Sequence, residues 1–177
     1  MKKFDIAIIG GGILGTTISY WISNLYDSSV CVIEKESNVA KHTSGRNTGV
    51  VHTPFYLNPE KKRIFAKSAH ISHDLWKTLA KNTMSPWDEI GTIEVALDEI
   101  QYKTLQKYQK WGIQNGVSEN NLSLLDSNEL KQKEKNIECY SGLLCKSDVS
   151  TDYSKLTQEI QKISIQNSTE FLFQKNV

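Results

Sequence analysis

The start of the chain alternates between short apolar runs and polar breaks in a strand–helix–strand order. Residues 4–9 form an isoleucine-rich run, which is typical of a parallel strand covered on both faces. Residues 13–25 repeat apolar side chains with helical spacing, so we expect a helix with one inward apolar face. Residues 30–34 predict a second buried strand, which closes at an acidic residue. The inward face of the helix would consist of Leu14, Ile18, Trp21, Ile22 and Leu25.

Polar residues that favour helix starts divide the rest of the chain. Residues 35–58 lack a helical period and predict a long ordered loop, which in a compact domain is usually functional. Asn58 before Pro59 predicts the start of a helix. Its inward face would consist of Phe65, Ala69, Trp76 and Leu79. Further helix starts are predicted at Asp98, at Asp126 or Ser127, and at Asp152.

Shorter apolar runs predict additional strands between these helices. They cover residues 92–97, 122–125, 140–145 and 169–174. In the first of them we expect Ile93, Val95 and Leu97 on the buried side, because these residues alternate with polar ones. The succession of strands and helices predicts an α/β fold class.

Composition and charge exclude several classes of protein. The net charge is +1, from 21 Lys and Arg against 20 Asp and Glu, so we expect neither nucleic acid nor an anionic membrane surface as a partner. With 38% hydrophobic and 23% charged residues, the chain is too apolar for a disordered protein. Its apolar runs are far shorter than the ~20 residues that span a bilayer, so we expect no integral membrane segment.

The cysteines and the first residues bear on the compartment. Three cysteines do not make a disulfide scaffold, and their odd number favours a reducing compartment. Lys2 and Lys3 precede an apolar run, as in a signal peptide, but Asp5 interrupts that run and glycines follow it. We therefore expect a cytoplasmic protein, with Cys31 in its core.

A glycine motif follows the first predicted strand and opens the first predicted helix. In Gly10-x-Gly12-x-x-Gly15 the first glycine makes a tight turn, the second allows a pyrophosphate to approach the backbone, and the third allows close packing of helix on strand. The helix start at Ile13 and Leu14 would offer N–H groups and a partial positive charge to the phosphates. The alternative is a glycine-rich turn in another kind of α/β protein.

Glu34 and the loop after it favour one dinucleotide over another. Glu34 ends the second strand, about 20 residues after the motif, where a carboxylate accepts hydrogen bonds from ribose hydroxyls. This pattern fits both NAD and FAD. The loop of small, hydroxyl and amide side chains after it favours FAD, because it suits a ribityl chain or a second phosphate. The loop residues are Thr43, Ser44, Arg46, Asn47, Thr48 and Gly49, of which Arg46 would compensate phosphate charge; the alternative is an ordinary turn-rich loop with a solvated Arg46.

Three parts of the sequence resemble the FAD-dependent oxidoreductases of the D-amino-acid oxidase and glycerol-3-phosphate dehydrogenase superfamily. They are the glycine motif, Glu34 with Lys35, and the run from Ser44 to His52. Within this superfamily the sequence most resembles L-2-hydroxyglutarate oxidases and dehydrogenases. The likeness continues through residues 91–96 and 114–117 to Asp152 and Tyr153.

This resemblance implies a Rossmann-like FAD-binding domain with an interleaved, partial α+β substrate-binding domain. Residues 1–84 would form the first part of the FAD-binding domain, residues 85–150 part of the substrate-binding domain, and residues 151–177 the return to the FAD-binding domain. The chain would then be the N-terminal part of a larger flavoenzyme. The resemblance adds Lys35, Val51 and the backbone around Val177, near the adenine, to the expected cofactor contacts.

The expected function is FAD-dependent oxidation of a small 2-hydroxy acid, such as L-2-hydroxyglutarate, by hydride transfer to the flavin. The alternatives are a glycerol-3-phosphate dehydrogenase, an amine or amino-acid oxidase, or a catalytically incomplete FAD-binding fragment. An NAD-binding module is disfavoured by the loop. Residues 53–56, which begin Thr53-Pro54, and Glu134 before Lys135 depart from the family pattern, and both differences bear on the substrate. The partner would be a small-molecule substrate, and the electron acceptor stays open.

Among the histidines, His52 is the expected catalytic base. It follows the cofactor loop directly, and an imidazole with a pKa near 6.5 takes up a proton at neutral pH. The alternatives are a histidine that positions the flavin, or one that bonds to it covalently as in some relatives. His70 and His73 have helical i, i+3 spacing, but no third ligand accompanies them, so we expect no metal site.

Overall fold

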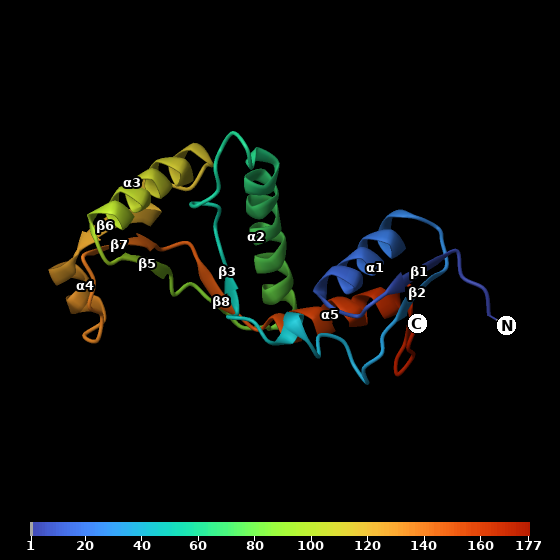
Figure 1. Cartoon of the computed structure of the whole chain (residues 1–177). Helices are drawn as coiled ribbons and strands as arrows, with labels where there is room; N and C mark the ends of the chain where they lie inside the picture. Colours follow the sequence, from blue (N-terminus) through green and yellow to red (C-terminus); the bar gives the residue numbers. More distant parts are fainter. Residues whose placement is uncertain (1) are drawn as a thin grey trace. The chain divides into compact units, whose positions relative to one another are not determined.

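The computed structural model describes residues 2–177, and the chain divides into two compact units (Figure 1). Unit 1 contains the chain up to Gly49, together with Leu79–Ser85 and Asp152–Val177. Unit 2 contains Val50–Thr78 and Pro86–Thr151. The long helix α2 (Arg63–Thr83) contributes residues to both. Unit 2 thus includes residues 50–78, which the sequence analysis groups with the FAD-binding residues.

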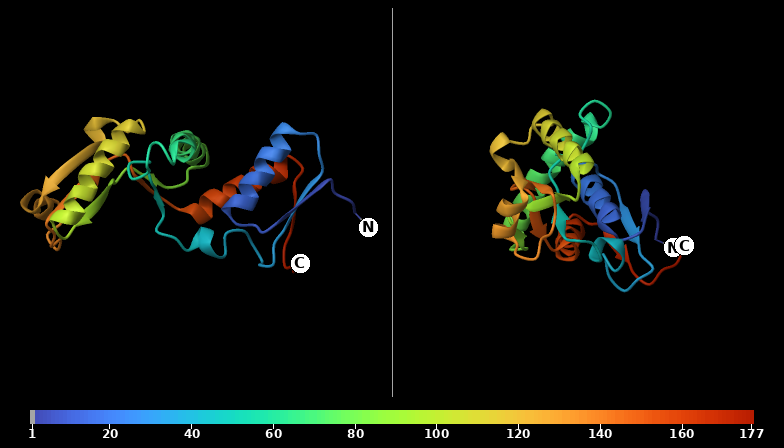
Figure 2. Two further views of the ribbon diagram at one scale, coloured as in Figure 1. Left: turned by 45° about the horizontal axis from the view of Figure 1, so that its top comes forward. Right: turned by 60° about the vertical axis from the view of Figure 1, so that its left-hand side comes forward.

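Unit 1 is built on a parallel three-stranded sheet. Its strands are β1 (Ile6–Ile9), β2 (Val30–Ile33) and β9 (Glu170–Leu172), in the order β1-β2-β9. The last strand of the chain therefore lies in the same sheet as the first strand–helix–strand unit. Figure 2 shows α1 (Ile13–Leu25) and α5 (Tyr153–Gln166) packed side by side.

Small hydroxyl residues form the contact between α1 and α5. Thr16 and Ser19 of α1 and Thr157 and Ser164 of α5 are fully buried. The Oγ atoms of Ser19 and Ser164 are 3.3 Å apart, and each of these hydroxyls also donates to a carbonyl of its own helix. Short side chains allow the helix backbones to approach closely, and their own helices satisfy their polar groups.

The apolar face of α1 was predicted to point inward, and this prediction is wrong. Leu14 is 77% exposed, and Ile18, Trp21 and Leu25 are also exposed. The expected cover on both faces of β1 is wrong as well, because Ala7 and Ile9, whose side chains lie on the same face of the strand, are both exposed. The periodic pattern identifies an apolar stripe correctly, but α5 packs on the opposite, hydroxyl-bearing side of the helix.

Unit 2 contains two antiparallel sheets. The first orders β3 (Val50–Val51), β8 (Val149–Thr151) and β4 (Trp87–Asp88) as β3-β8-β4. The second orders β5 (Thr92–Ala96), β7 (Ser141–Cys145) and β6 (Leu122–Asp126) as β5-β7-β6. The strands β3, β4 and β8 are too short for a period to predict them. The 3₁₀ turns η1 (Thr43–Gly45) and η2 (Glu119–Asn121) complete the connections, η1 in unit 1 and η2 in unit 2.

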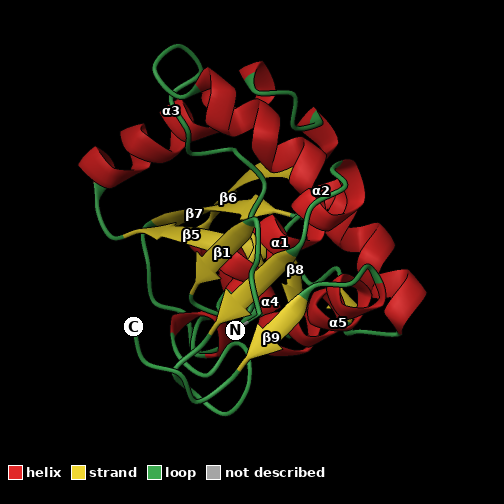
Figure 3. Ribbon diagram, turned by 90° about the vertical axis from the view of Figure 1, so that its right-hand side faces the viewer, coloured by secondary structure: helices red, strands yellow, loops and turns green. Residues whose placement is uncertain are grey.

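The helix α3 (Glu99–Gln114) covers one face of the second sheet, as Figure 3 shows. The core between them consists of Phe55, Ala96, Leu105, Val117, Leu122, Leu143 and Cys145. Gly112 permits this packing, because a Cβ at that position would lie 2.5 Å from Leu122 and 2.9 Å from Phe55. The short helix α4 (Ser127–Lys133) contacts β6 and β7 and buries Leu130.

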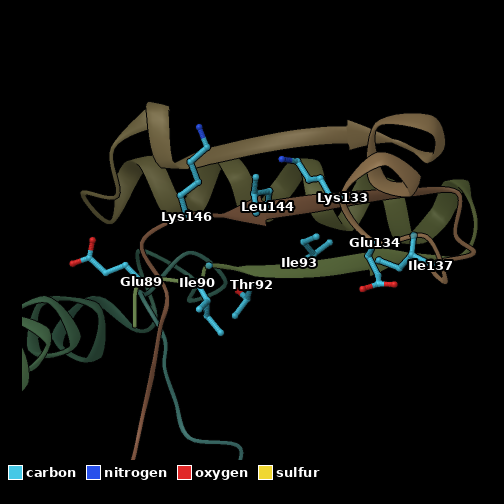
Figure 4. Close-up of a pocket in the computed structure, with 10 residues that line it drawn as sticks. Glu89, Ile90, Thr92, Ile93, Lys133, Glu134, Ile137, Leu144 and Lys146 are labelled. Atoms are coloured by element: carbon cyan, nitrogen blue, oxygen red, sulfur yellow. The ribbon is translucent and has the colours of Figure 1, made fainter. Parts of the chain in front are cut away.

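The prediction of which face of β5 is buried is wrong. Ala96 is buried in the core, whereas Val95 and Leu97 are exposed. The cause is α3, which begins just after the strand and packs on the side of Ala96. Because side chains alternate between faces, Ile93 then falls on the opposite, open face of the sheet. Figure 4 shows that face, where Ile93 and Leu144 line a hollow of about 730 Å³.

The predicted helix starts are largely confirmed. The side chain of Asp98 accepts from Gln101 N–H, and that of Asp152 accepts from Lys155 N–H. Asp126 forms a capping box with Glu129 at the start of α4. By contrast, Asn58 caps a turn, through Glu60 N–H and Lys61 N–H, that precedes α2 at Arg63.

The prediction of the inward face of α2 is partly wrong. Phe65, which was expected to point inward, is exposed, and its neighbour Ala66 is buried instead. Across residues 2–177, no helix combines the length and the apolar character needed to cross a membrane.

Candidate functional site

The turn between β1 and α1 depends on its glycines. Gly10 has a φ of +103°, a conformation that L side chains rarely adopt, and its N–H donates to Ile33 C=O at 2.8 Å. A Cβ on Gly15 would lie only 2.0 Å from the carbonyl oxygen of Gly10. The helix therefore starts in direct contact with the turn, as the first and third glycines of a dinucleotide motif require.

The side chain of Glu34 is hydrogen-bonded to this turn. Its side chain is 8% exposed; Oε2 accepts from Gly11 N–H at 2.6 Å and Oε1 accepts from Glu36 N–H at 2.9 Å. A carboxylate offers about four lone-pair sites, so each oxygen keeps capacity for a further donor. Its orientation is fixed before any ligand arrives, which suits the recognition of sugar hydroxyls. The adjacent Lys35 is exposed.

The loop of residues 43–49 contacts the same turn through Ser44. Its Oγ accepts from Ile13 N–H at 2.9 Å and would lie 3.1 Å from a Cβ on Gly12. Within residues 2–177, the N–H groups of Leu14 and Gly15 have no hydrogen-bond acceptor, and the first turn of α1 carries no acidic residue. The helix start thus keeps free N–H groups for a phosphate.

Asn47 shapes the loop with its own side chain. Its Nδ2 donates to Thr43 C=O and Ser44 C=O, and its Oδ1 accepts from Gly49 N–H at 2.8 Å. The amide is therefore used inside the loop. The side chains of Thr43, Arg46 and Thr48 are exposed, and Gly49 has a φ of +71°.

The end of the chain returns to Glu34. Lys175 N–H donates to Glu34 C=O at 3.1 Å, and Gln174 N–H donates to Glu36 C=O at 3.0 Å. Val177 itself is exposed. Its expected contact with a cofactor stays a prediction.

A second polar cluster lies within unit 2 around Asp148, which is fully buried. Its Oδ2 accepts from His52 Nδ1 and from Thr92 Oγ1, both at 2.7 Å. Its Oδ1 accepts from Thr53 N–H at 2.7 Å and from Thr53 Oγ1 at 2.8 Å. Three segments of the chain thereby converge on one carboxylate.

These contacts set the charges of the cluster. Burial alone would raise the pKa of Asp148, but the hydrogen bonds from His52, Thr53 and Thr92 outweigh it and lower that pKa. The hydrogen bond to Asp148 raises the pKa of His52; burial opposes this rise, and the negative charges of Asp148 and Glu94 add to it. The pair therefore favours a carboxylate beside an imidazole that holds a proton readily.

Asp148 carries no recognisable motif, so the sequence does not predict its role. It lies 96 positions from His52 in the sequence, in the turn between β7 and β8. The strand β8 was itself not predicted. Val51, by contrast, is buried in β3 opposite Val149. The glycine turn, Glu34 and Ser44 lie in unit 1, whereas Val51 and His52 lie in unit 2, so the proximity of His52 to a flavin stays a prediction.

His70 and His73, the two histidines of α2, lie within hydrogen-bond distance of backbone carbonyls. His70 Nε2 lies 2.7 Å from Asn115 O, and His73 Nε2 lies 3.3 Å from Ser147 O. His73 also packs edge-on against Trp87. These contacts explain both residues as parts of the packing around α2.

The glycine turn, the fixed carboxylate and the free N–H groups define a dinucleotide-binding α/β protein. The chain matches the family of FAD dependent oxidoreductases (DAO) over residues 5–177, and it belongs to that family. The predicted fold class and the choice of FAD over NAD are thereby confirmed. The residues also fit the cofactor, because the space around Gly10 is open and the helix start beside it has free N–H groups and no acidic residue in its first turn.

Two curated relatives represent the similarity in sequence. The chain is 31% identical to the mitochondrial L-2-hydroxyglutarate dehydrogenase of Bos taurus over 168 residues, which is 89% of this chain and 35% of the relative. It is 32% identical to the glycerol 3-phosphate oxidase of Mycoplasma pneumoniae over 146 residues, which is 81% of this chain and 37% of the relative. The chain thus spans little more than a third of these relatives.

Two solved structures represent the similarity in fold. The L-alpha-glycerophosphate oxidase of Mycoplasma pneumoniae with FAD bound superposes with a TM-score of 0.86 at 26% identity, over all of this chain and 46% of that one. The glycine oxidase of Geobacillus kaustophilus superposes with a TM-score of 0.85 at 17% identity, over all of this chain and 48% of that one. The second likeness concerns the fold alone.

Replacing Gly15 by Ala tests the turn. The new Cβ would collide with the Gly10 carbonyl, so we expect a loss of stability of about 1–3 kcal/mol and a matching loss of FAD retention. Leu14→Ala is the control, because it keeps the backbone N–H and removes an exposed side chain. Urea unfolding and the fluorescence of retained FAD measure both effects. Equal FAD retention in the two variants would contradict the role of Gly15.

The cluster around Asp148 also predicts a pH dependence of stability. The pKa of His52 is higher in the folded chain than in the unfolded chain. The contribution of His52 to the free energy of unfolding is therefore complete below pH 6.5, and it is lost as the pH rises through the pKa of the folded state. His52→Gln should therefore lower the free energy of unfolding more at about pH 5 than at about pH 8. Urea unfolding at the two pH values checks this, with His70→Gln as the control, because the ring of His70 contacts a backbone carbonyl and not a carboxylate. A pH-independent difference would show that no such linkage exists.

Proposed function

We propose that the chain binds FAD through the glycine turn of unit 1 and belongs to an enzyme that oxidises a small 2-hydroxy acid of the L-2-hydroxyglutarate type. The observation that carries the cofactor assignment is the closure of the turn by two side chains, Glu34 on Gly11 N–H and Ser44 on Ile13 N–H. The substrate assignment is supported by the relatives named L-2-hydroxyglutarate dehydrogenase.

Each part of the turn has a role in this proposal. Gly10 leaves the backbone open to the pyrophosphate, and the free N–H of Leu14 donates to it. Gly12 and Gly15 allow the close contacts with Ser44 and the Gly10 carbonyl that hold the turn. Glu34 accepts from the adenosine ribose hydroxyls and would repel a 2′-phosphate. Lys35, Thr43, Arg46, Thr48 and the backbone near Val177 complete the proposed contacts, with Val51 and His52 toward the flavin.

His52 is the proposed base. Oxidation of a hydroxyl carbon to a carbonyl removes one hydride from carbon and one proton from oxygen. The cofactor, when bound, supplies the acceptor for the hydride. His52 takes the proton on its imidazole ring, which can accept a proton near neutral pH. In the same proposal residues 1–84 and 151–177 form the FAD-binding domain, and residues 85–150 contribute to the substrate-binding domain.

Glycerol 3-phosphate is the second candidate substrate. The similarity to the Mycoplasma pneumoniae glycerol 3-phosphate oxidase, at 32% identity, favours it. Both substrates carry a hydroxyl on the carbon to be oxidised and an anionic group. The same proton-accepting histidine serves either of them.

Cofactor choice is tested by thermal unfolding of the chain with FAD or NAD. At a concentration of 100 times its dissociation constant, FAD should stabilise the chain by about 2.7 kcal/mol. NAD should produce no shift at the same concentration. A Glu34→Ala variant should weaken the FAD effect, because it removes the ribose acceptor. Stabilisation by NAD alone would refute FAD as the ligand.

Substrate choice is tested by anaerobic mixing of the FAD-loaded chain with L-2-hydroxyglutarate, its D enantiomer or glycerol 3-phosphate. We expect loss of flavin absorbance near ~450 nm with L-2-hydroxyglutarate, because that absorbance disappears on reduction. Bleaching with glycerol 3-phosphate alone would overturn the first choice in favour of the second. FAD that is bound but inert to all three compounds would instead indicate a chain that binds cofactor without turnover.

A further inference from the structure

The carboxylate of Asp148 is fully buried and still has every hydrogen-bond site filled. His52 and Thr92 occupy Oδ2, and the backbone and hydroxyl of Thr53 occupy Oδ1. The Sγ of Cys145 adds a weak fifth donor at 3.4 Å. A carboxylate provides about four lone-pair sites, so these donors leave it neither a free site nor freedom to rotate.

We propose that Asp148 is a positioning residue for His52, which it holds with the proton on Nδ1 so that Nε2 is the atom that accepts the proton of the substrate. This inference rests on the proposed role of His52 as a base. It extends that role by naming the atom of His52 that reacts and the residue that selects it.

The tautomer follows from the chemistry of the contact. An ionised carboxylate only accepts hydrogen bonds, so His52 Nδ1 must donate at a separation of 2.7 Å. In a neutral imidazole the other nitrogen then carries a lone pair. Within residues 2–177, Nε2 of His52 has no hydrogen-bond partner, and the side chain is 41% exposed. The lone pair is therefore open to a substrate.

The donors around Asp148 keep the carboxylate charged despite its burial. Thr53 follows β3, and Thr92 begins β5, so the carboxylate is fixed from two strands at once. When His52 takes up a proton, the imidazolium forms beside a negative charge that is already oriented, which favours proton transfer. The other titratable groups that face the pair are Tyr56, whose ring meets that of His52 edge-on, Glu94, and Cys145, whose Sγ lies 3.4 Å from Asp148 Oδ1.

Histidine NMR on the ¹⁵N-labelled chain tests this inference without any activity measurement. The His52→Gln variant identifies the His52 signals. In the wild-type chain we expect the Nδ1–H tautomer and a pKa above 6.5. An Nε2–H tautomer in the wild-type chain would overturn the inference, whatever the variants do.

Asp148→Asn then tests the carboxylate itself. The amide is nearly the same shape but can donate to Nδ1, so the proton should move to Nε2 and the pKa of His52 should fall. Asp98→Asn is the matched control, because it makes the same chemical change at a helix cap of the same unit. Equal His52 spectra in the two variants would contradict the positioning role.

Flavin reduction by substrate separates this inference from the proposed function. In the FAD-loaded chain, Asp148→Asn should slow substrate-dependent reduction by at least about 10²-fold and move its pH profile to lower pH. His52→Gln should slow reduction to a similar extent. If the flavin in His52→Gln is reduced as fast as in the wild type, the base role of His52 is refuted, and the inference about Asp148 is refuted with it. If His52→Gln is slow but Asp148→Asn is not, the base role stands and only the positioning role is refuted.

Discussion

Two carboxylates among residues 2–177 are buried, and each can be buried only because hydrogen-bond donors converge on it. Burial of an unpaired charge costs several kcal/mol, so the backbone around Glu34 and Asp148 must supply partners. Glu34 receives Gly11 N–H and Glu36 N–H, which ties the glycine turn to the end of β2. Asp148 receives Thr53 N–H, Thr92 and His52, which ties β3, β5 and the loop before β8 together. The same requirement thus builds both functional clusters.

In unit 1 small hydroxyl residues lie buried at the contact between α1 and α5, while apolar residues of β2 and α5, such as Val32 and Leu156, form the buried interior. Thr16, Ser19 and Ser164 bring α1 and α5 together, while Leu14 and Trp21 remain exposed. In unit 2, α3 buries Leu105, Leu143 and their neighbours against a sheet. The apolar pattern therefore predicts the buried strand β2 correctly, but it does not predict which face of α1 or of β5 is covered.

The glycine motif, the strand–helix–strand order and the helix caps could be predicted because each depends on neighbours in the sequence. Gly10 and Gly15 are only a helical turn and a half apart, and Asp98 caps a helix through a residue three positions away. The short strands β3, β4 and β8 escaped prediction because two or three residues carry no period. Asp148 escaped because its partners are about 56 to 96 positions away along the chain.

Local physics in the sequence therefore settled the cofactor class: a turn that only glycine can make, followed by a carboxylate at the end of the next strand, specifies a dinucleotide site. Tertiary structure alone decided which face of α1 and of β5 is covered, since a stripe of apolar side chains does not say what packs against it. It also decided the state of His52. The position of His52 after residues 43–49 makes it a candidate base, but its raised pKa comes from a buried carboxylate that only folding brings within 2.7 Å.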